Sequence, residues 1–166
     1  MYKYFLHKED FNNKIVFWDI DGTLAAYRFN GYMTHGPTEQ FLHDIEDGVF
    51  LNRPPSKHIQ RIINEINSTN IVLGHCVNDK EISDKRIWLQ KHFPKIKHYI
   101  FLDLYKKGSK EFTSKADEIL KYCKSNNIDK KNCIFIDDSI SLLVDAQNKG
   151  IESWHISSLF DYFERM

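Results

Sequence analysis

The sequence predicts an α/β protein with a doubly wound, mostly parallel sheet and helices on both faces of the sheet. Two observations lead to this prediction: short apolar runs recur along the chain, and segments of helical period separate them. The runs are continuous rather than alternating in polarity, which is typical of strands covered on both faces. Because no repeat, low-complexity tract or Gly/Ser-rich linker interrupts this pattern, we expect a single domain over residues 1–166.

Five apolar runs are candidate strands. They are residues 15–18, 71–73, 99–102 and 134–136, with a weaker run at 153–156. Since strand and helix alternate, we expect right-handed β-α-β crossovers that place parallel strands side by side. Ligands of such sheets bind beyond the carboxyl ends of the strands. Reactive side chains should therefore follow the apolar runs directly.

Helical periods fill the intervals between the runs. Residues 59–66 and 116–123 each place apolar side chains on one helical face, and Ser114 is a capping residue for the second of these helices. Residues 140–147 predict a further helix, and a shorter one is expected to end at Pro94. These helices supply the crossovers that a doubly wound sheet requires.

The composition argues against several classes of protein. Lysine and arginine number 23, against 23 aspartates and glutamates, which argues against a protein that mainly coats nucleic-acid phosphates. No apolar run approaches the roughly 20 residues that span a bilayer, and the charged N-terminus does not resemble a secretory signal. The three cysteines, Cys76, Cys123 and Cys133, lack zinc or redox spacing. We expect buried free thiols and a cytoplasmic protein.

Acidic side chains follow two of the apolar runs directly. Asp19 and Asp21 come after the first run, with Gly22 to permit a sharp turn, and Asp137 and Asp138 come after the fourth. Aspartates also cap helices and end strands, but two such pairs at separate buried strands favour a shared site. Clustered carboxylates repel one another unless a cation lies among them. Mg²⁺ suits a site with few carboxylates and several waters.

The segment Asp19-Ile20-Asp21-Gly22-Thr23 resembles the first motif, DxDGT, of the haloacid dehalogenase-like hydrolase superfamily, and Asp137-Asp138 resembles the fourth motif. The resemblance covers about residues 14–156. It implies a Rossmann-like core without a large cap domain. It also implies a Mg²⁺-dependent phosphoric monoester hydrolase, a phosphatase that works through an aspartyl-phosphate intermediate.

The resemblance also implies a role for each motif residue. Asp19 would be the nucleophile and a metal ligand. Asp21 would be the general acid and base and would bind the metal through its backbone carbonyl. Asp137 would be a metal ligand, and Asp138 would either bind the metal, through water, or orient other ligands. Lys115 would stabilise the nucleophile and the phosphoryl oxygens.

Two parts of the expected site stay open at this stage. Lys107 and Lys110 compete with Lys115 for the role of the lysine. The family places a Ser or Thr at the end of the second strand to bind phosphate, but this chain has Gly74 followed by His75. The backbone N–H of Gly74, or the His75 ring, could bind phosphate instead, and His75 could equally be structural. This departure favours, as the alternative function, a weakly active or non-catalytic phosphate-binding module.

Residues 25–50 leave room for a small flap but not for a large lid. Asn30-Gly31 predicts a hairpin turn over residues 27–33, and residues 38–47 predict a small helix. Substrate choice would then depend on Arg28, Tyr32, His35 and the basic residues 106–110. We expect a small phosphorylated substrate such as a nucleotide. A nucleic-acid or phosphoprotein substrate, and phosphotransfer to another acceptor, remain alternatives.

Overall fold

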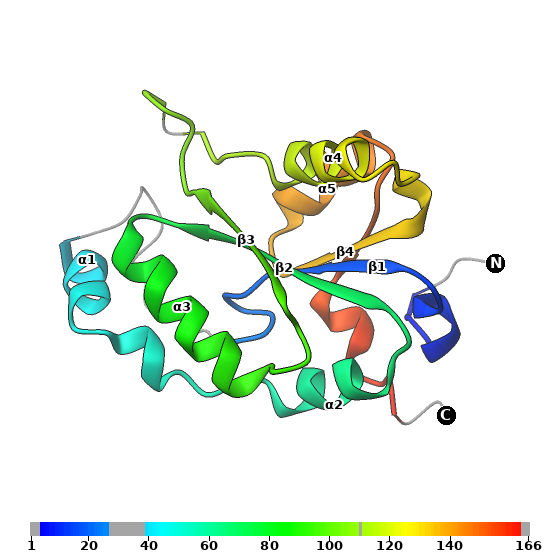
Figure 1. Ribbon diagram of the computed structural model, residues 1–166, viewed down its shortest axis with the longest axis horizontal. Coiled ribbons are helices and arrows are strands. Elements are labelled where there is room, and N and C mark those ends of the chain that lie inside the picture. Colours follow the sequence, from blue (N-terminus) through cyan, green and yellow to red (C-terminus); the bar gives the residue numbers. More distant parts are fainter. Residues whose placement is uncertain (1–3, 27–38, 110, 164–166) are drawn as a thin grey trace.

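A computed structural model describes residues 4–26, 39–109 and 111–163 of the chain. Its centre is a five-stranded parallel sheet with the strand order β3-β2-β1-β4-β5 (Figure 1). Starting from β1, the strands β2 and β3 follow towards one edge of the sheet. The strands β4 and β5 then lie on the other side of β1. This reversal makes the sheet doubly wound, as predicted, and puts the switch point between β1 and β4. The strands are Ile15–Trp18 (β1), Thr69–Cys76 (β2), His98–Asp103 (β3), Cys133–Asp137 (β4) and Glu152–His155 (β5).

Helices cover both faces of this sheet. In Figure 1, α4 and α5 lie on one side of the sheet, and α2 and α3 lie on the other. Side chains of β1 alternate between the two sides, so that Phe17 packs with α4 and α5 while Val16 and Trp18 pack with α2 and α3. Both faces of β1 are therefore buried, which explains its continuous apolar sequence. The helices are Glu39–Glu46 (α1), Lys57–Glu65 (α2), Asp79–His92 (α3), Lys115–Ser125 (α4) and Ile140–Asn148 (α5).

The sequence prediction for α3 is wrong in its length. The helix has 14 residues and begins at Asp79, well before the shorter helix expected from the apolar pattern. Its first half buries Glu81, Asp84 and Lys85, so charged side chains occupy the positions where an apolar period would be sought. The helix ends at His92, before the Phe93-Pro94 pair, as the restriction on residues preceding proline requires.

Two short insertions lie near the carboxyl ends of the strands. The first contains α1, which confirms the small helix expected in this region, whereas the predicted hairpin at 27–33 lies outside the described residues. The second joins β3 to α4, where Tyr105 and Phe112 form an antiparallel bridge. We call this second insertion, residues 104–113, the β3–α4 hairpin; residue 110 in it is not described. The described part of the chain contains no large cap domain, and none of its helices is long and apolar enough to cross a bilayer.

Candidate active site

The two aspartates that end β1 and β4 lie at the switch point of the sheet. The backbone N–H of Asp19 donates to the carbonyl of Ile136 at 2.9 Å, so the ladder between β1 and β4 continues one residue past the end of β1. Asp137 is the last residue of β4. Both side chains line a pocket of about 280 Å³, in the place where an open α/β sheet binds its ligand.

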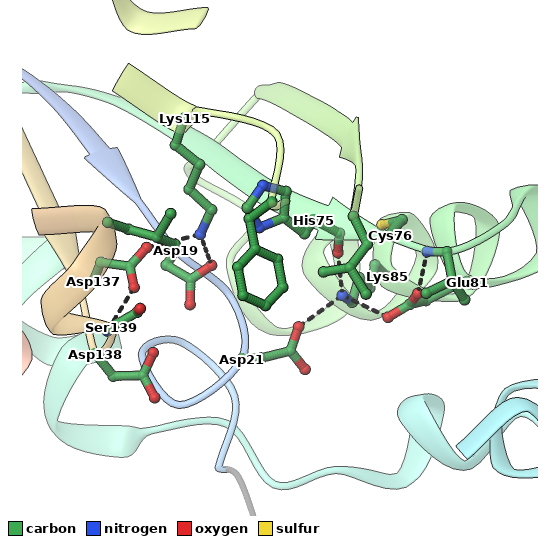
Figure 2. A pocket seen from close by; sticks show the side chains of 14 residues that line it. Asp19, Asp21, His75, Cys76, Glu81, Lys85, Lys115, Asp137, Asp138 and Ser139 are labelled. Atoms are coloured by element: carbon green, nitrogen blue, oxygen red, sulfur yellow. Dashed lines mark hydrogen bonds and ion pairs between the residues drawn. The ribbon is translucent and has the colours of Figure 1, made fainter. Parts of the chain in front are cut away.

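Lys115 joins these two carboxylates. It is the first residue of α4, and its buried Nζ donates to Asp137 Oδ2 at 2.7 Å and to Asp19 Oδ1 (Figure 2). Burial by itself would lower the pKa of Lys115, but the charges of the two aspartates outweigh burial and raise that pKa to about 12. Of the competing lysines, Lys107 is not among the residues that line the pocket, and Lys110 lies outside the described residues.

Three of the four residues expected to hold a metal form an acidic group in this pocket. Each of Asp19, Asp137 and Asp138 offers a carboxylate oxygen, and these three oxygens lie within 4.8 Å of one another. Figure 2 shows the three side chains gathered on one side of the pocket. Burial, followed by the charge of Asp137, raises the pKa of Asp138 to about 6. Burial also raises the pKa of Asp19 well above its ordinary range, although Lys115 opposes this change.

This donor set suits a hard divalent cation. Three carboxylates face one ammonium group, so negative charge is in excess, and all the donor atoms are oxygens. Mg²⁺ prefers such ligands and would offset the mutual repulsion of these carboxylates. The position of Asp138 within the group makes it a candidate for direct coordination. The residues present therefore fit the expected metal.

Gly22 leaves room for the Asp138 carboxylate in this group. It has a φ of 80°, in the left-handed region that favours glycine. A Cβ atom built on Gly22 would lie only 2.1 Å from Oδ2 of Asp138. The turn after Asp21 therefore needs a glycine for two reasons, which are its backbone conformation and the close approach of the Asp138 carboxylate.

The Asp21 side chain lies apart from the acidic group. Its Oδ2 accepts a hydrogen bond from Lys85 Nζ at 2.7 Å, and its Oδ1 pairs with the guanidinium of Arg53 (Figure 2 shows the Lys85 pair). Burial would raise the pKa of Asp21, but the charges of Lys85 and Arg53 hold it below its ordinary value. Asp21 is therefore an ionised carboxylate between two cations in the protein without ligand.

Lys85 is the centre of this second network. Its side chain is 1% exposed, and its Nζ contacts Asp21, the backbone carbonyl of His75 at 2.8 Å and Glu81 Oε1 at 2.7 Å. The other oxygen of Glu81 accepts the N–H of Val77 at 2.8 Å. Every proton of the ammonium group thus has an acceptor, and the network joins β2, α3 and the turn after β1.

Sequence reasoning missed Arg53, Glu81 and Lys85. A signal exists for two of them, because Glu81 and Lys85 lie four residues apart and share a helical face with Trp88. A charged pair in line with a buried tryptophan indicates a buried ion pair. Arg53 has no comparable local signal; Trp88 Nε1 donates to its carbonyl at 2.8 Å and so helps to position it.

The structure separates the roles of Gly74 and His75. Gly74 is not among the pocket-lining residues, and a Cβ atom there would lie 2.6 Å from Cδ1 of Ile20. Its lack of a side chain therefore allows close packing against Ile20. His75 lines the pocket, but its Nε2 bonds to the Thr113 carbonyl at 2.7 Å. Burial lowers the pKa of His75 to about 4, so its ring is neutral.

Two further predictions from the sequence concern the cysteines and the flap residues. All three cysteines are buried and free, as expected. Of the flap residues, Arg28, Tyr32 and His35 lie outside the described residues.

Comparison with known proteins places this geometry in a fold family. The sequence matches no family model, and no curated protein is significantly similar to it. Solved structures do match. A haloacid dehalogenase-like hydrolase from Streptococcus pneumoniae has a TM-score of 0.58 and 14% identity over 91% of both chains. A phosphoserine phosphatase, solved as an analogue of its phospho-aspartyl intermediate, has a TM-score of 0.52 and 13% identity over 84% of both chains.

A third solved structure holds a metal. It is the N-terminal part of a Bacteroides fragilis protein that contains a phosphatase domain complexed with Mg, with a TM-score of 0.51 and 13% identity. The match covers 94% of this chain and 39% of that one. These likenesses agree with the five-stranded parallel sheet and its strand order. The chain therefore has the fold of the haloacid dehalogenase-like hydrolases.

Proposed function

We propose that this protein is a Mg²⁺-dependent phosphatase that hydrolyses phosphomonoesters through an aspartyl-phosphate on Asp19. The observation that carries the proposal is the position of Asp19, which lies in a pocket between a buried lysine and two further carboxylates. Solved structures of the same fold include a phosphoserine phosphatase described as a phospho-aspartyl analogue. Asp19 is the residue of this chain that corresponds to such a nucleophile in the DxDGT motif.

The chemistry follows from the residues around Asp19. An oxygen of Asp19 attacks phosphorus and the bond from phosphorus to the ester oxygen breaks. The leaving oxygen takes its proton from Asp21 when Asp21 is protonated, and otherwise from solvent water. Water then attacks the aspartyl-phosphate, which releases inorganic phosphate and restores the carboxylate. Lys115 stabilises the negative charge on Asp19 and on the phosphoryl oxygens. A bound Mg²⁺, held by Asp19, Asp137, Asp138 and the backbone carbonyl of Asp21, would offset the repulsion between two anionic reactants.

Asp21 is suited to one of its two expected tasks. As an ionised carboxylate it can accept a proton from the water of the second step. Its pairs with Arg53 and Lys85 oppose the protonation that the first step needs. We therefore expect esters of phenols, whose oxygens leave without a proton, to react faster than esters of simple alcohols.

The test is phosphate release from a panel of phosphomonoesters in Mg²⁺ or in EDTA. We expect turnover only with Mg²⁺, and we expect Asp19→Asn and Asp21→Asn to abolish it. Asp47→Asn, which changes an exposed aspartate outside the pocket, is the matched control and should retain wild-type rates. Mass spectrometry of the acid-quenched protein should detect a phosphoryl adduct on Asp19. Unchanged turnover in Asp19→Asn would remove the covalent mechanism.

A second candidate function is phosphate binding without turnover. Two observations favour it: no Ser or Thr occupies the second-motif position, and two cations hold Asp21 as a carboxylate. A protein that binds inorganic phosphate in calorimetry but releases none from any ester of the panel would establish this alternative.

The setting of the reaction is part of the same proposal. We place the protein in the cytoplasm, as a single domain that acts on a small phosphorylated substrate. Three buried free thiols support a reducing compartment. The small pocket supports a small substrate.

A further inference from the structure

We propose that the site selects phosphomonoesters whose alcohol part carries a flat aromatic ring, and that Phe112 recognises this ring. The inference rests on the proposed phosphatase function, because it assigns the part of the same pocket that lies beyond the phosphate. A nucleobase and a simple phenyl group share the required chemistry, and the experiment below distinguishes them.

The lining of the pocket combines charged and apolar side chains. The acidic group and Lys115 belong to the charged part. The apolar part includes Val77 after β2, Leu104 and Phe112 of the β3–α4 hairpin, and Leu142 of α5. Four apolar side chains from three separate segments thus line the same pocket in which the phosphoryl group is expected. A hydrophobic group attached to the phosphate would contact this wall and leave water.

The positive side chains that line the described pocket are already paired. Lys115 is bound by Asp19 and Asp137, and Lys85 by Asp21 and Glu81. The only histidine in this lining, His75, is neutral, because burial lowers its pKa to about 4. A second phosphate or a carboxylate on the substrate would therefore meet no unpaired cation in this lining, which disfavours bisphosphates and phosphorylated amino acids.

Phe112 is placed to contact a ring. It is stacked with His75 at 6.0 Å and 25° and with Tyr105 at 5.4 Å and 19°, measured between ring centroids and planes. Its side chain is still 45% exposed, although these two rings flank it. An aromatic group of the substrate would cover the exposed part of Phe112 and pack against this group of rings, for example edge to face.

The hairpin holds Phe112 in position before any ligand binds. The N–H of Lys106 donates to the Glu111 carbonyl at 2.9 Å, and the N–H of Thr113 donates to the Leu104 carbonyl at 3.2 Å. The carbonyl of Thr113 also bonds to the His75 ring, which ties the hairpin to β2. Because the hairpin is already ordered, it loses little conformational entropy when a ligand binds.

The experiment compares substrates whose leaving oxygens are alike. Adenosine 5′-monophosphate is paired with ribose 5-phosphate, and 3-phenylpropyl phosphate with hexyl phosphate, so the leaving groups of each pair have similar basicity. We expect kcat/KM to be about tenfold higher for the aromatic member, the size that one stacking contact supplies. A preference in both pairs indicates any aromatic ring, and a preference for the nucleotide alone indicates a nucleobase; both support the proposal. Equal values in both pairs overturn it.

Variants of Phe112 assign the preference to this residue. In Phe112→Leu the ratio of kcat/KM within each pair should fall below about twofold, and in Phe112→Tyr it should be retained. Phe160→Leu is the matched control, because Phe160 is an exposed aromatic residue outside this pocket. A preference that survives in Phe112→Leu overturns the assignment. So does an equal loss on both members of a pair, since that result indicates a merely structural role.

A binding measurement separates this inference from the proposed reaction. In Asp19→Asn, which should not turn over, calorimetry with Mg²⁺ should give a roughly tenfold lower Kd for adenosine 5′-monophosphate than for ribose 5-phosphate. An inert wild-type protein with this difference in Kd would contradict the phosphatase and support the aromatic site. An active protein with equal Kd values would support the phosphatase and overturn the aromatic site.

Discussion

Lys85 and Arg53 determine the charge of Asp21, and neither residue belongs to a motif that the sequence displays. Asp19 and Asp21 are two positions apart, yet their surroundings differ. Asp19 faces Lys115 and two other carboxylates, whereas Asp21 faces two cations. Burial outweighs Lys115 and raises the pKa of Asp19, whereas the two cations outweigh burial and lower the pKa of Asp21. At the residue scale, the motif predicts which side chains act, and their neighbours determine the proton each one carries.

Replacing the buried lysine tests this network. Lys85→Met leaves Asp21 and Glu81 without their shared cation, and an unpaired buried charge is costly, so we expect a loss of about 3–5 kcal/mol in the free energy of unfolding. Urea denaturation measures it. Lys121→Met is the control, because Lys121 forms an exposed ion pair on α4 and should change stability by less than about 1 kcal/mol. Similar losses in both variants would show that the buried network does not contribute in this way.

Asp138 should make stability depend on pH in the absence of metal. Its folded pKa, about 6, lies above its ordinary value of 3.8, so the folded state holds the proton more tightly. Its contribution to stability is therefore full below pH 4, falls between about pH 4 and 6, and is constant above pH 6. In EDTA, the stability of Asp138→Asn relative to wild type should rise over that interval and then level off. Urea midpoints at pH 4, 5, 6 and 7 measure the change, and a flat difference would contradict the raised pKa.

At the scale of helices and strands, the ends of elements position the proposed catalytic groups. Ser114 caps α4 by accepting the N–H of Asp117 at 3.1 Å, and it also donates to Asp145 of α5 at 2.6 Å. Lys115 follows the cap directly, so the start of the helix sets the direction of its side chain. The sequence predicted this cap correctly, because a serine before a helical period is a local signal. It missed the length of α3, because buried charges interrupt the apolar period there.

The cap of α4 should therefore affect both stability and catalysis. Ser114→Ala removes the capping oxygen and the bond to Asp145, so we expect a loss of about 1–2 kcal/mol in the free energy of unfolding and a clear loss in kcat. Ser56→Ala is the matched control, because Ser56 caps α2, and α2 contributes no residue to the pocket. It should lose stability without the loss in kcat. Equal effects on kcat would show that the cap does not position Lys115.

At the scale of the whole molecule, the doubly wound topology brings the residues of the site together. The acidic group joins Asp19 to Asp137 and Asp138, which lie 118 and 119 residues further along the chain, and the pairing of β1 with β4 brings the two parts together. A cation bound there joins the two halves of the sheet. Metal binding should consequently stabilise the entire fold rather than one loop.

Magnesium should raise the melting temperature of the wild-type protein. At a concentration one hundred times its Kd, a ligand that binds only the folded state adds about 2.7 kcal/mol. We expect a larger increase at pH 7.5 than at pH 5, because protons compete for Asp19 and Asp138, whose pKa values are raised. Asp137→Asn should abolish the increase, and NaCl of equal ionic strength is the control. An increase that persists in Asp137→Asn would place the cation elsewhere.

Local pattern was sufficient to predict much of this protein. Continuous apolar runs located β1, β2, β3 and β4, because a strand covered on both faces is apolar along its length, and a weaker run located β5. The same pattern located Asp19, Asp21, Asp137 and Asp138 at strand ends, where the topology rule places a ligand. These features depend on neighbours in sequence or on a general property of parallel sheets.

Long-range contacts supplied the rest. Lys85 and Arg53 meet Asp21 across 64 and 32 residues of sequence, and Ile20 leaves no room for a side chain at position 74. The β3–α4 hairpin brings Phe112 to the pocket, although residues 106–110 show only a basic loop in the sequence. Charge state and pocket shape depend on interactions between residues that are close in space. These interactions weaken with distance, and the spacing of residues along the sequence does not show them. For that reason the motif predicts a type of chemistry, whereas the folded chain determines which side chains carry a proton and which shape the pocket has.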